Sequence, residues 1–359
     1  MPKTTTSLNP LSAEDQARRA RLRYVTDQDA GYTRLRNGRG FVYANLRGKR
    51  VADTRCVARI EGLAIPPAWK EVWICKFSNG HLQATGRDSR KRKQYRYHDR
   101  WSEIANLSKF FQLKAFGDVL PQLRKRVSND LKGSQLTRTR VVAGIVALLD
   151  LTAIRVGNEE YVKENNSYGL TTLRNRHVSV SGSKLELRFN GKGGFRRQIP
   201  LVDKKLERFI TQCRALAAGR LFQYVDFDGK SHSVDSTDVN EYLQTISGVP
   251  VSAKDFRTWK ASALMAGLLH AHRDEAKPRK RKAILKAAIA QTAEMLANTP
   301  TVCRNYYLHP GMLSEFEAGT LPRFFQRFSP RPRSSLSIDE QILMRFLRRW
   351  KPSANSHAE

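Results

Sequence analysis

The chain is poor in acidic residues: 33 Asp and Glu stand against 64 Lys and Arg, which gives a formal net charge of +31 over 359 residues. Such an excess of one sign costs self-repulsion in the folded state, and an enzyme acting on neutral molecules has no use for it. We therefore expect a polyanionic partner, with nucleic acid favoured over an anionic membrane surface.

Other signals are missing as well. The amino-terminal segment has no apolar stretch of the signal-peptide kind, and the longest apolar run, 141–149, is far shorter than the roughly 20 residues of a membrane-spanning helix. The four cysteines form no CxxC pair, and neither HExxH nor GxxxxGK[ST] occurs. We expect free thiols, a cytoplasmic protein without membrane association, and no metal or nucleotide cofactor.

The chain nevertheless has what a folded protein needs. Hydrophobic residues make up 40% of it, which excludes a wholly disordered chain, and its length predicts about two domains. Residues 24 to about 100 carry short alternating runs separated by turns, and Asn79-Gly80 between two such runs is typical of a β-hairpin. After residue 100, apolar residues recur at helical spacing, with an alternating interlude over 177–201.

These patterns predict an α+β protein: a small β-rich amino-terminal domain and a mainly helical domain containing a small β-hairpin or sheet. The expected limits are a flexible basic arm at 1–22, the β-rich domain at 23–103, the helical domain at 104–325 and an Arg- and Pro-rich tail at 326–359, in which 339–350 is a last possible helix.

The densest run of positive charge is GRDSRKRKQYRYH, residues 86–98. On a strand, Tyr95 and Tyr97 point to one face, with Gln94 and Arg96 on the other. Cations neutralise phosphates, and glutamine can hydrogen-bond a base edge in the major groove. A solvated basic loop is the alternative, but this combination favours nucleic-acid contact. The side chains expected to make it are Arg90, Lys93, Gln94, Tyr95 and Tyr97.

Three segments of the helical region carry cations suited to phosphate binding. Arg155 follows an apolar helical run, and it can either pair with Glu159 or Glu160 or grip a phosphate through two hydrogen bonds. Lys192 lies in a turn with three glycines, where backbone can approach a ligand closely; an ordinary exposed lysine is the alternative. Arg257 opens a further helical stretch, where a structural arginine is the alternative.

The fourth segment begins at Asn298, where we expect a helix to stop because Pro300 blocks its continuation. It contains Tyr306 and Tyr307 beside Arg304. A buried aromatic is one interpretation of each tyrosine. Cations close to a tyrosine stabilise the phenolate relative to its ordinary pKa of about 10, and this activates the oxygen as a nucleophile.

In order and spacing, the four segments resemble the type IB DNA topoisomerases, in particular the compact poxvirus-type and bacterial branch. The matching motifs are IRVGNEEY, SYGLTTL, GKGG, KDFRTW and NTPTVCRNYYLHP, together with IPPAW and residues 80–98 in the amino-terminal part. The resemblance implies a catalytic set of Arg155, Lys192, Arg257, Asn298 and Tyr307, with Lys254 as a further DNA contact.

Two details of this set depend on single positions. Asn298 stands where poxvirus and eukaryotic members have a histidine; bacterial members commonly have asparagine, which can donate a hydrogen bond but cannot move a proton. Tyr307 is preferred to Tyr306 because it lies three residues after Arg304 and nine after Asn298.

The resemblance also implies a course of reaction. Both domains close on duplex DNA as a clamp, and Tyr307 attacks a phosphodiester to give a 3′-phosphotyrosyl enzyme. Lys192 protonates the leaving 5′ oxygen, while Arg155, Arg257 and Asn298 stabilise the phosphoryl charge. Swivelling and religation then relax positive and negative supercoils without ATP or metal. The family further implies a monomer in the bacterial cytoplasm, associated with the nucleoid.

Two alternatives remain open at this point. A tyrosine recombinase or integrase uses a similar residue set, but its second arginine usually follows a histidine as HxxR, and Lys254 occupies that position here. A non-enzymatic DNA-binding protein explains the charge but leaves the ordered set of five residues unexplained.

Overall fold

The computed structural model describes residues 12–89, 91–181, 184–216, 219–275, 277–326, 328–331 and 335–350, apart from the side chains of 102–109, 111, 181 and 184. Contacts divide the chain into two units, Met1–Phe111 and Gln112–Glu359. The division falls within one long helix, α3 (Asp99–Asp130), whereas the sequence predicted a boundary at 103/104. Within the described ranges, no helix combines the length and apolar character that a bilayer crossing requires.

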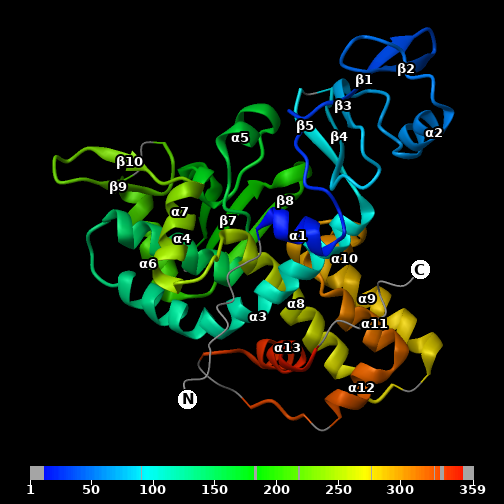
Figure 1. Ribbon diagram of the computed structural model, residues 1–359. Helices are drawn as coiled ribbons and strands as arrows, with labels where there is room; N and C mark the ends of the chain where they lie inside the picture. The colour runs from blue at the N-terminus through cyan, green and yellow to red at the C-terminus, as the bar shows by residue number, and fades with distance from the viewer. Residues whose placement is uncertain are drawn as a thin grey trace, which may run out of the picture. The chain divides into compact units, whose positions relative to one another are not determined.

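The first unit contains a five-stranded antiparallel sheet in the order β2-β1-β3-β4-β5 (Figure 1). Its elements are β1 (Gly31–Asn37), β2 (Gly40–Ala44), α2 (Thr54–Gly62), β3 (Lys70–Cys75), β4 (Leu82–Arg87) and β5 (Lys93–Tyr97). One hydrophobic core cluster of the unit is formed by Tyr43, Ile60, Val72, Ile74 and Ala84. The predicted hairpin at Asn79-Gly80 is confirmed, because β3 and β4 pair antiparallel on either side of it.

The segment expected to be a flexible arm is in part helical. Helix α1 (Ala13–Arg19) begins after Ser12, whose hydroxyl accepts a hydrogen bond from the backbone N–H of Asp15. Ala17, Ala20 and Leu22 are buried together. From Ser12 onward the chain is therefore folded, because a capped turn with small apolar side chains on one face can be buried; residues 1–11 lie outside the described ranges.

The second unit is mainly helical, as predicted. Its helices are α4 (Arg138–Thr152), α5 (Glu159–Asn165), α6 (Lys204–Leu216), α7 (Ser236–Ser247), α8 (Ala253–Ala271), α9 (Pro278–Leu296), α10 (Pro300–Tyr307), α11 (Pro310–Ala318), α12 (Thr320–Phe325) and α13 (Ile338–Arg349). The predicted β interlude is confirmed as an antiparallel sheet of β6 (Val178–Ser181), β7 (Lys184–Asn190) and β8 (Arg196–Leu201). A separate hairpin is formed by β9 (Gln223–Val225) and β10 (Ser231–Ser233).

The stretch expected to be an Arg- and Pro-rich tail contributes helix α13, which packs against α8 (Figure 1). Its Glu340 carboxylate is 5% exposed and accepts hydrogen bonds from Trp259 Nε1 at 2.8 Å and from Arg124 Nη2 at 2.7 Å. The alternation of Ile342, Leu343 and neighbouring apolar side chains with arginines gives α13 a buried face. This helix is therefore part of the core of the second unit.

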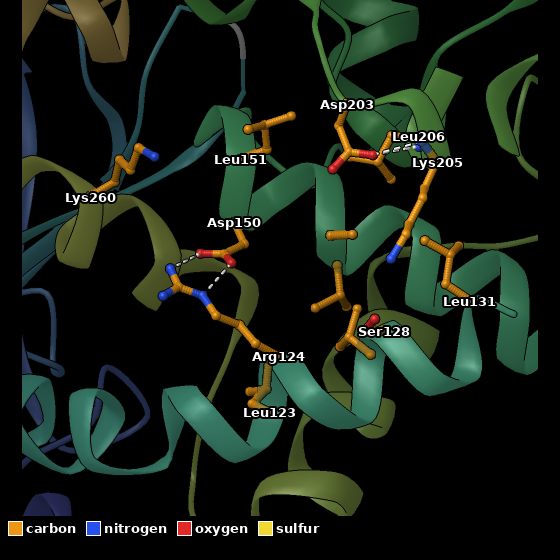
Figure 2. A pocket seen from close by; sticks show the side chains of 13 residues that line it. Leu123, Arg124, Ser128, Leu131, Asp150, Leu151, Asp203, Lys205, Leu206 and Lys260 are labelled. Carbon is orange, nitrogen blue, oxygen red and sulfur yellow. Dashed lines mark hydrogen bonds and ion pairs between the residues drawn. The ribbon is translucent and has the colours of Figure 1, made fainter. Parts of the chain in front are cut away.

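A groove of about 310 Å³ lies between α3, α4 and the start of α6 (Figure 2). Its most conspicuous polar contact is the pair of Arg124 and Asp150, whose Nε and Oδ2 atoms are 2.7 Å apart. The residues that line this groove include none of the predicted catalytic side chains.

Candidate active site

The predicted catalytic side chains come from five separate segments of the second unit. They are Arg155 after α4, Lys192 between β7 and β8, Arg257 in α8, Asn298 after α9 and Tyr307 at the end of α10. Four of them, all except Asn298, line one cavity of about 250 Å³, and Lys254 lines it too. Asn298 is joined to the group through Arg155, whose Nη2 donates to Asn298 Oδ1 at 2.9 Å.

The carboxyl end of α9 holds two of these arginines in place. Arg257 Nη2 donates to the carbonyl of Leu296 at 3.0 Å, and its Nη1 makes a short hydrogen bond to the carbonyl of Ala153. Arg155 reaches the same helix end through Asn298. Carbonyls in the last turn of a helix lack helical partners and carry partial negative charge, so they stabilise cations.

The backbone at this helix end corrects one sequence expectation. Helix α9 ends at Leu296, and Ala297 takes the left-handed conformation with φ 48°, ahead of the stop expected at Asn298. Pro300 is the first residue of α10 and does not merely block α9. Proline suits this position because the first N–H of a helix has no helical acceptor.

Arg155 does not take either of the ion-pair partners considered from sequence. Glu159 pairs with Arg220, whose Nη2 is 2.7 Å from Glu159 Oε1. The backbone carbonyl of Arg155 accepts from the N–H of Leu170 at 2.9 Å. A Cβ on Gly169 would lie 2.5 Å from Gly157, so the SYGLTTL motif packs directly on the loop that carries Arg155. The motif was recognised in the sequence as part of the family resemblance, but its supporting role was not predicted.

Arg257 is 4% exposed. Burial and the neighbouring charge of Arg155 lower the pKa of Arg257 to about 10. Within the described residues, its Nε and the Nδ2 of Asn298 are buried without a hydrogen-bond acceptor. Buried donors of this kind cost free energy, and an anionic oxygen would satisfy them.

Tyr307 is 9% exposed, whereas the neighbouring Tyr306 is 56% exposed. The Arg257 Cζ lies 5.3 Å from the centroid of the Tyr307 ring, and Ser262 Oγ donates to the Tyr307 carbonyl at 3.0 Å. Burial acts to raise the pKa of Tyr307, but the charge and hydrogen bond of Arg257, with the charges of Arg155 and Lys254, outweigh it and lower the pKa from 10. The geometry thus favours Tyr307 over Tyr306 as an activated phenol.

Lys192 is exposed at the tip of the β7–β8 hairpin. Its Nζ lies 5.0 Å from the centroid of the Tyr161 ring, a cation–π contact. Gly193 and Gly194 follow with φ values of 80° and 78°, a conformation that glycine adopts without strain. Lys192 is therefore at the cavity but is held less firmly than the arginines.

Four of the side chains expected to bind nucleic acid in the first unit, Lys93, Gln94, Tyr95 and Tyr97, lie on β5, an edge strand of its sheet. Tyr95 and Tyr97 are 48% and 40% exposed, and their rings stack with centroids 5.9 Å apart, as the alternation of a strand predicts. Gln94 Nε2 donates to Asp88 Oδ2 at 3.0 Å, and Lys93 Nζ lies 2.5 Å from Asp27 Oδ2. Arg90, the remaining predicted contact of this segment, lies outside the described residues.

Comparisons with known proteins agree with this arrangement. The model of the eukaryotic DNA topoisomerase I catalytic core matches residues 92–319, and the model of the bacterial DNA topoisomerase IB N-terminal domain matches 40–88. DNA topoisomerase 1B of Acanthamoeba polyphaga mimivirus is 33% identical over 302 residues, which cover 82% of this chain and 89% of the relative. The chain belongs to the type IB DNA topoisomerase family.

More distant members of the same family give lower identities. DNA topoisomerase 1B of vaccinia virus strain Copenhagen is 22% identical over 229 residues, or 62% of this chain and 68% of the relative. DNA topoisomerase 1 of Schizosaccharomyces pombe is 31% identical over 168 residues, which cover 45% of this chain but 19% of that relative. Type IB topoisomerases are isomerases that act on DNA. Membership of this family therefore excludes the two alternatives considered from sequence, a tyrosine recombinase and a non-enzymatic DNA-binding protein.

Proposed function

We propose that this type IB topoisomerase relaxes positive and negative supercoils by cutting and resealing one strand of duplex DNA. The observation that supports the proposal most directly is the cavity shared by Tyr307, Arg155, Arg257 and Lys192. It combines a nucleophile whose pKa is lowered with cations placed to bind a phosphate.

In the proposed cleavage step, the Tyr307 oxygen forms a bond to phosphorus while the bond from phosphorus to the 5′ oxygen breaks. The phenolic proton leaves to solvent, and Lys192 donates a proton to the departing 5′ oxygen. The products are a 3′-phosphotyrosyl enzyme and a free 5′-hydroxyl, and attack by that hydroxyl reseals the strand. Because the phosphodiester bond is exchanged rather than hydrolysed, the cycle needs no ATP.

Arg155, Arg257 and Asn298 are proposed to stabilise negative charge on the non-bridging phosphoryl oxygens. Arg257 Nε and Asn298 Nδ2 are buried and have no acceptor among the described residues, which supports this role, since both are donors fixed before substrate arrives. Cationic side chains would then perform the charge stabilisation for which other phosphoryl-transfer enzymes use metal ions. Within the described part of the chain, no three His, Cys, Asp or Glu side chains gather as a metal site.

The DNA contacts are proposed to involve both units. Lys93, Gln94, Tyr95 and Tyr97 on β5 are suited to phosphate, sugar and base, and Arg90 remains a predicted contact in the same run. Lys254 is exposed at the start of α8 and lines the cavity of Tyr307. We further propose that the protein acts as a monomer on DNA of the bacterial nucleoid in the cytoplasm; its match to a bacterial N-terminal domain model favours this setting.

The deciding experiment is relaxation of negatively and positively supercoiled plasmids by purified protein in EDTA without ATP. We expect both substrates to be relaxed, because swivelling follows whichever torque is stored. Denaturation during the reaction should trap protein on the 3′ end of a nicked strand. A requirement for ATP, a divalent metal or paired specific sites would contradict the proposal.

A further inference from the structure

The active-site crevice contains a cation that the predicted catalytic set does not include. Arg197 lies on β8 and lines a small crevice together with Arg155, Lys192 and Arg257. Burial, followed by the positive charge of Arg155, lowers the pKa of Arg197. A cation held against such repulsion needs a structural or functional reason.

The stem of Arg197 lies against the base of the hairpin that carries Lys192. Arg197 is the cross-strand partner of Phe189, and its Cγ is 3.4 Å from the position that a Cβ on Gly191 would take. Gly191 immediately precedes Lys192, and its N–H donates to the carbonyl of Phe195 at 2.8 Å to close the hairpin. The side chain therefore braces the point from which Lys192 projects.

The guanidinium of Arg197 reaches a different part of the site. Its Nη1 donates to the carbonyl of Met295 at 3.1 Å, in the last turn of α9. The next carbonyl, that of Leu296, accepts from Arg257, and Asn298 accepts from Arg155. One helix end thus joins three arginines, and Arg197 is the one that comes from the sheet.

We propose that Arg197 is a positioning residue, which ties the Lys192 hairpin to the end of α9 and so sets the general acid relative to the phosphate-binding arginines. The backbone also holds the end of β7, where the N–H of Tyr168 donates to the carbonyl of Asn190 at 2.8 Å, whereas Lys192 itself contacts the ring of Tyr161 and two glycines follow it. Misplacement of a catalytic group by about 1 Å can cost on the order of 10²-fold in rate. The inference rests on the proposed role of Lys192 as general acid.

The chain offers a matched control in the preceding residue. Arg196 and Arg197 are neighbours on β8 and face opposite sides of the strand, and Arg196 is exposed. Arg197→Met keeps most of the stem but removes the donor to Met295. Arg197→Lys keeps the stem and one charged donor, and Arg196→Met removes the same charge from the other face.

The first test is single-turnover cleavage of a labelled duplex at a site mapped with wild-type protein. We expect Arg197→Met to slow cleavage roughly 10- to 100-fold, Arg197→Lys to recover part of that loss and Arg196→Met to match wild type. On a duplex with a 5′-bridging sulfur, whose thiolate leaves without needing a proton, Arg197→Met should return to within a few-fold of wild type. Wild-type rates for Arg197→Met, or equal slowing on both substrates, would overturn the assignment.

A second measurement needs neither DNA nor catalysis. Hydrogen exchange of the amides of residues 191–195 should be faster in Arg197→Met than in wild type or Arg196→Met, with similar melting temperatures for all three proteins. If hydrogen exchange in Arg197→Met equals that of wild type, the anchoring role is overturned, whatever the cleavage rate of the variant. Faster exchange combined with a Lys192→Ala variant that the sulfur substrate fails to rescue would instead overturn the general-acid role and leave the anchor in place.

Discussion

The β5 strand and the cavity around Tyr307 hold their proposed DNA contacts in different ways. On β5, consecutive residues of one exposed edge strand supply the side chains, and two stacked tyrosines are about half exposed. Around Tyr307, the side chains come from five distant segments. Arg257 is fixed by the carbonyls of Leu296 and Ala153, and Arg155 is fixed by the side chain of Asn298. Binding needs accessible surface, whereas transition-state stabilisation needs donors whose positions are settled in advance.

The largest effect that separates the Tyr307 cavity from β5 is expected at the nucleophile. Tyr307→Phe should abolish relaxation and covalent trapping while leaving DNA binding largely intact, because only the hydroxyl reacts and the ring continues to pack. Tyr306→Phe, altered at the exposed neighbour, should remain active. Plasmid relaxation and trapping of labelled DNA measure both variants, and an active Tyr307→Phe beside an inactive Tyr306→Phe would move the nucleophile to Tyr306.

The fixed donors give the next largest effect. Arg155→Ala and Arg257→Ala should each lower the single-turnover cleavage rate by about 10²–10³-fold, by analogy with the loss of one transition-state donor. Asn298→Ala should be milder because it removes a neutral donor. Melting temperatures serve as the control, since Arg257 also joins α8 to two other segments. Near-wild-type rates for all three variants would remove the proposed phosphate pocket.

Lys192 separates proton transfer from phosphate binding. Lys192→Ala should slow cleavage of ordinary DNA, because no group then protonates the leaving 5′ oxygen. A 5′-bridging sulfur should restore the cleavage rate of Lys192→Ala much more than that of Arg155→Ala. Cleavage assays with the paired substrates measure the difference, and equal failure of both variants on the sulfur substrate would assign Lys192 another role.

A smaller effect, on stability alone, is expected at Glu340. Burial acts to raise the pKa of this carboxyl, but its hydrogen bonds and charge pairing with Arg124 outweigh burial and lower the pKa from 4.5 to about 2. A carboxyl with a lowered pKa in the folded state contributes stability above pH 4.5 that is lost as the pH falls toward 2. Glu340→Gln should therefore cost up to about 3 kcal/mol at pH 7, and less at pH 3.

Denaturant unfolding at the two pH values measures the Glu340 effect. The control is Glu315→Gln, which breaks the more exposed pair with Arg349 and should cost less than about 1 kcal/mol. Equal costs for the two variants, or a cost that does not change with pH, would mean that α13 is not anchored through Glu340.

The sequence predicted those elements of the fold that are determined by residues close together in the chain. The Asn79-Gly80 turn, the alternating strands over 177–201 and the helix that carries Arg257 follow from local patterns, whereas the helix that carries Tyr307 was not predicted because Pro300 was interpreted as a stop. Arg197 was missed because a single arginine on an alternating strand gives no signal, and only the fold brings it to Met295. A last possible helix at 339–350 could be predicted from its sequence, but its burial could not, because its apolar face packs on α8, on Gly117 of α3 and on His309, which only the fold brings together.

The smallest expected effect concerns the exposed strand β5, and it tests whether this strand contributes to DNA binding without contributing to the chemical step. Substituting Gln94, Tyr95 and Tyr97 together with Ala should weaken productive binding but leave the cavity around Tyr307 intact, because these side chains belong to a different unit. Phosphate contacts make binding salt-dependent, with each neutralised phosphate contributing about −0.9 to the slope of log K against log[salt].

The triple variant should therefore lose relaxation activity mainly at high salt and low protein concentration, and recover it in part when more protein is added. A relaxation time course in EDTA across a salt series, for wild type and variant at two protein concentrations, measures this. Since Gln94 already donates to Asp88 while the tyrosine rings are exposed, most of the loss should persist when Gln94 is restored. A variant that matches wild type at every salt concentration would remove β5 from the DNA-binding surface, whereas a loss that added protein does not relieve would mean that this strand affects the chemical step as well.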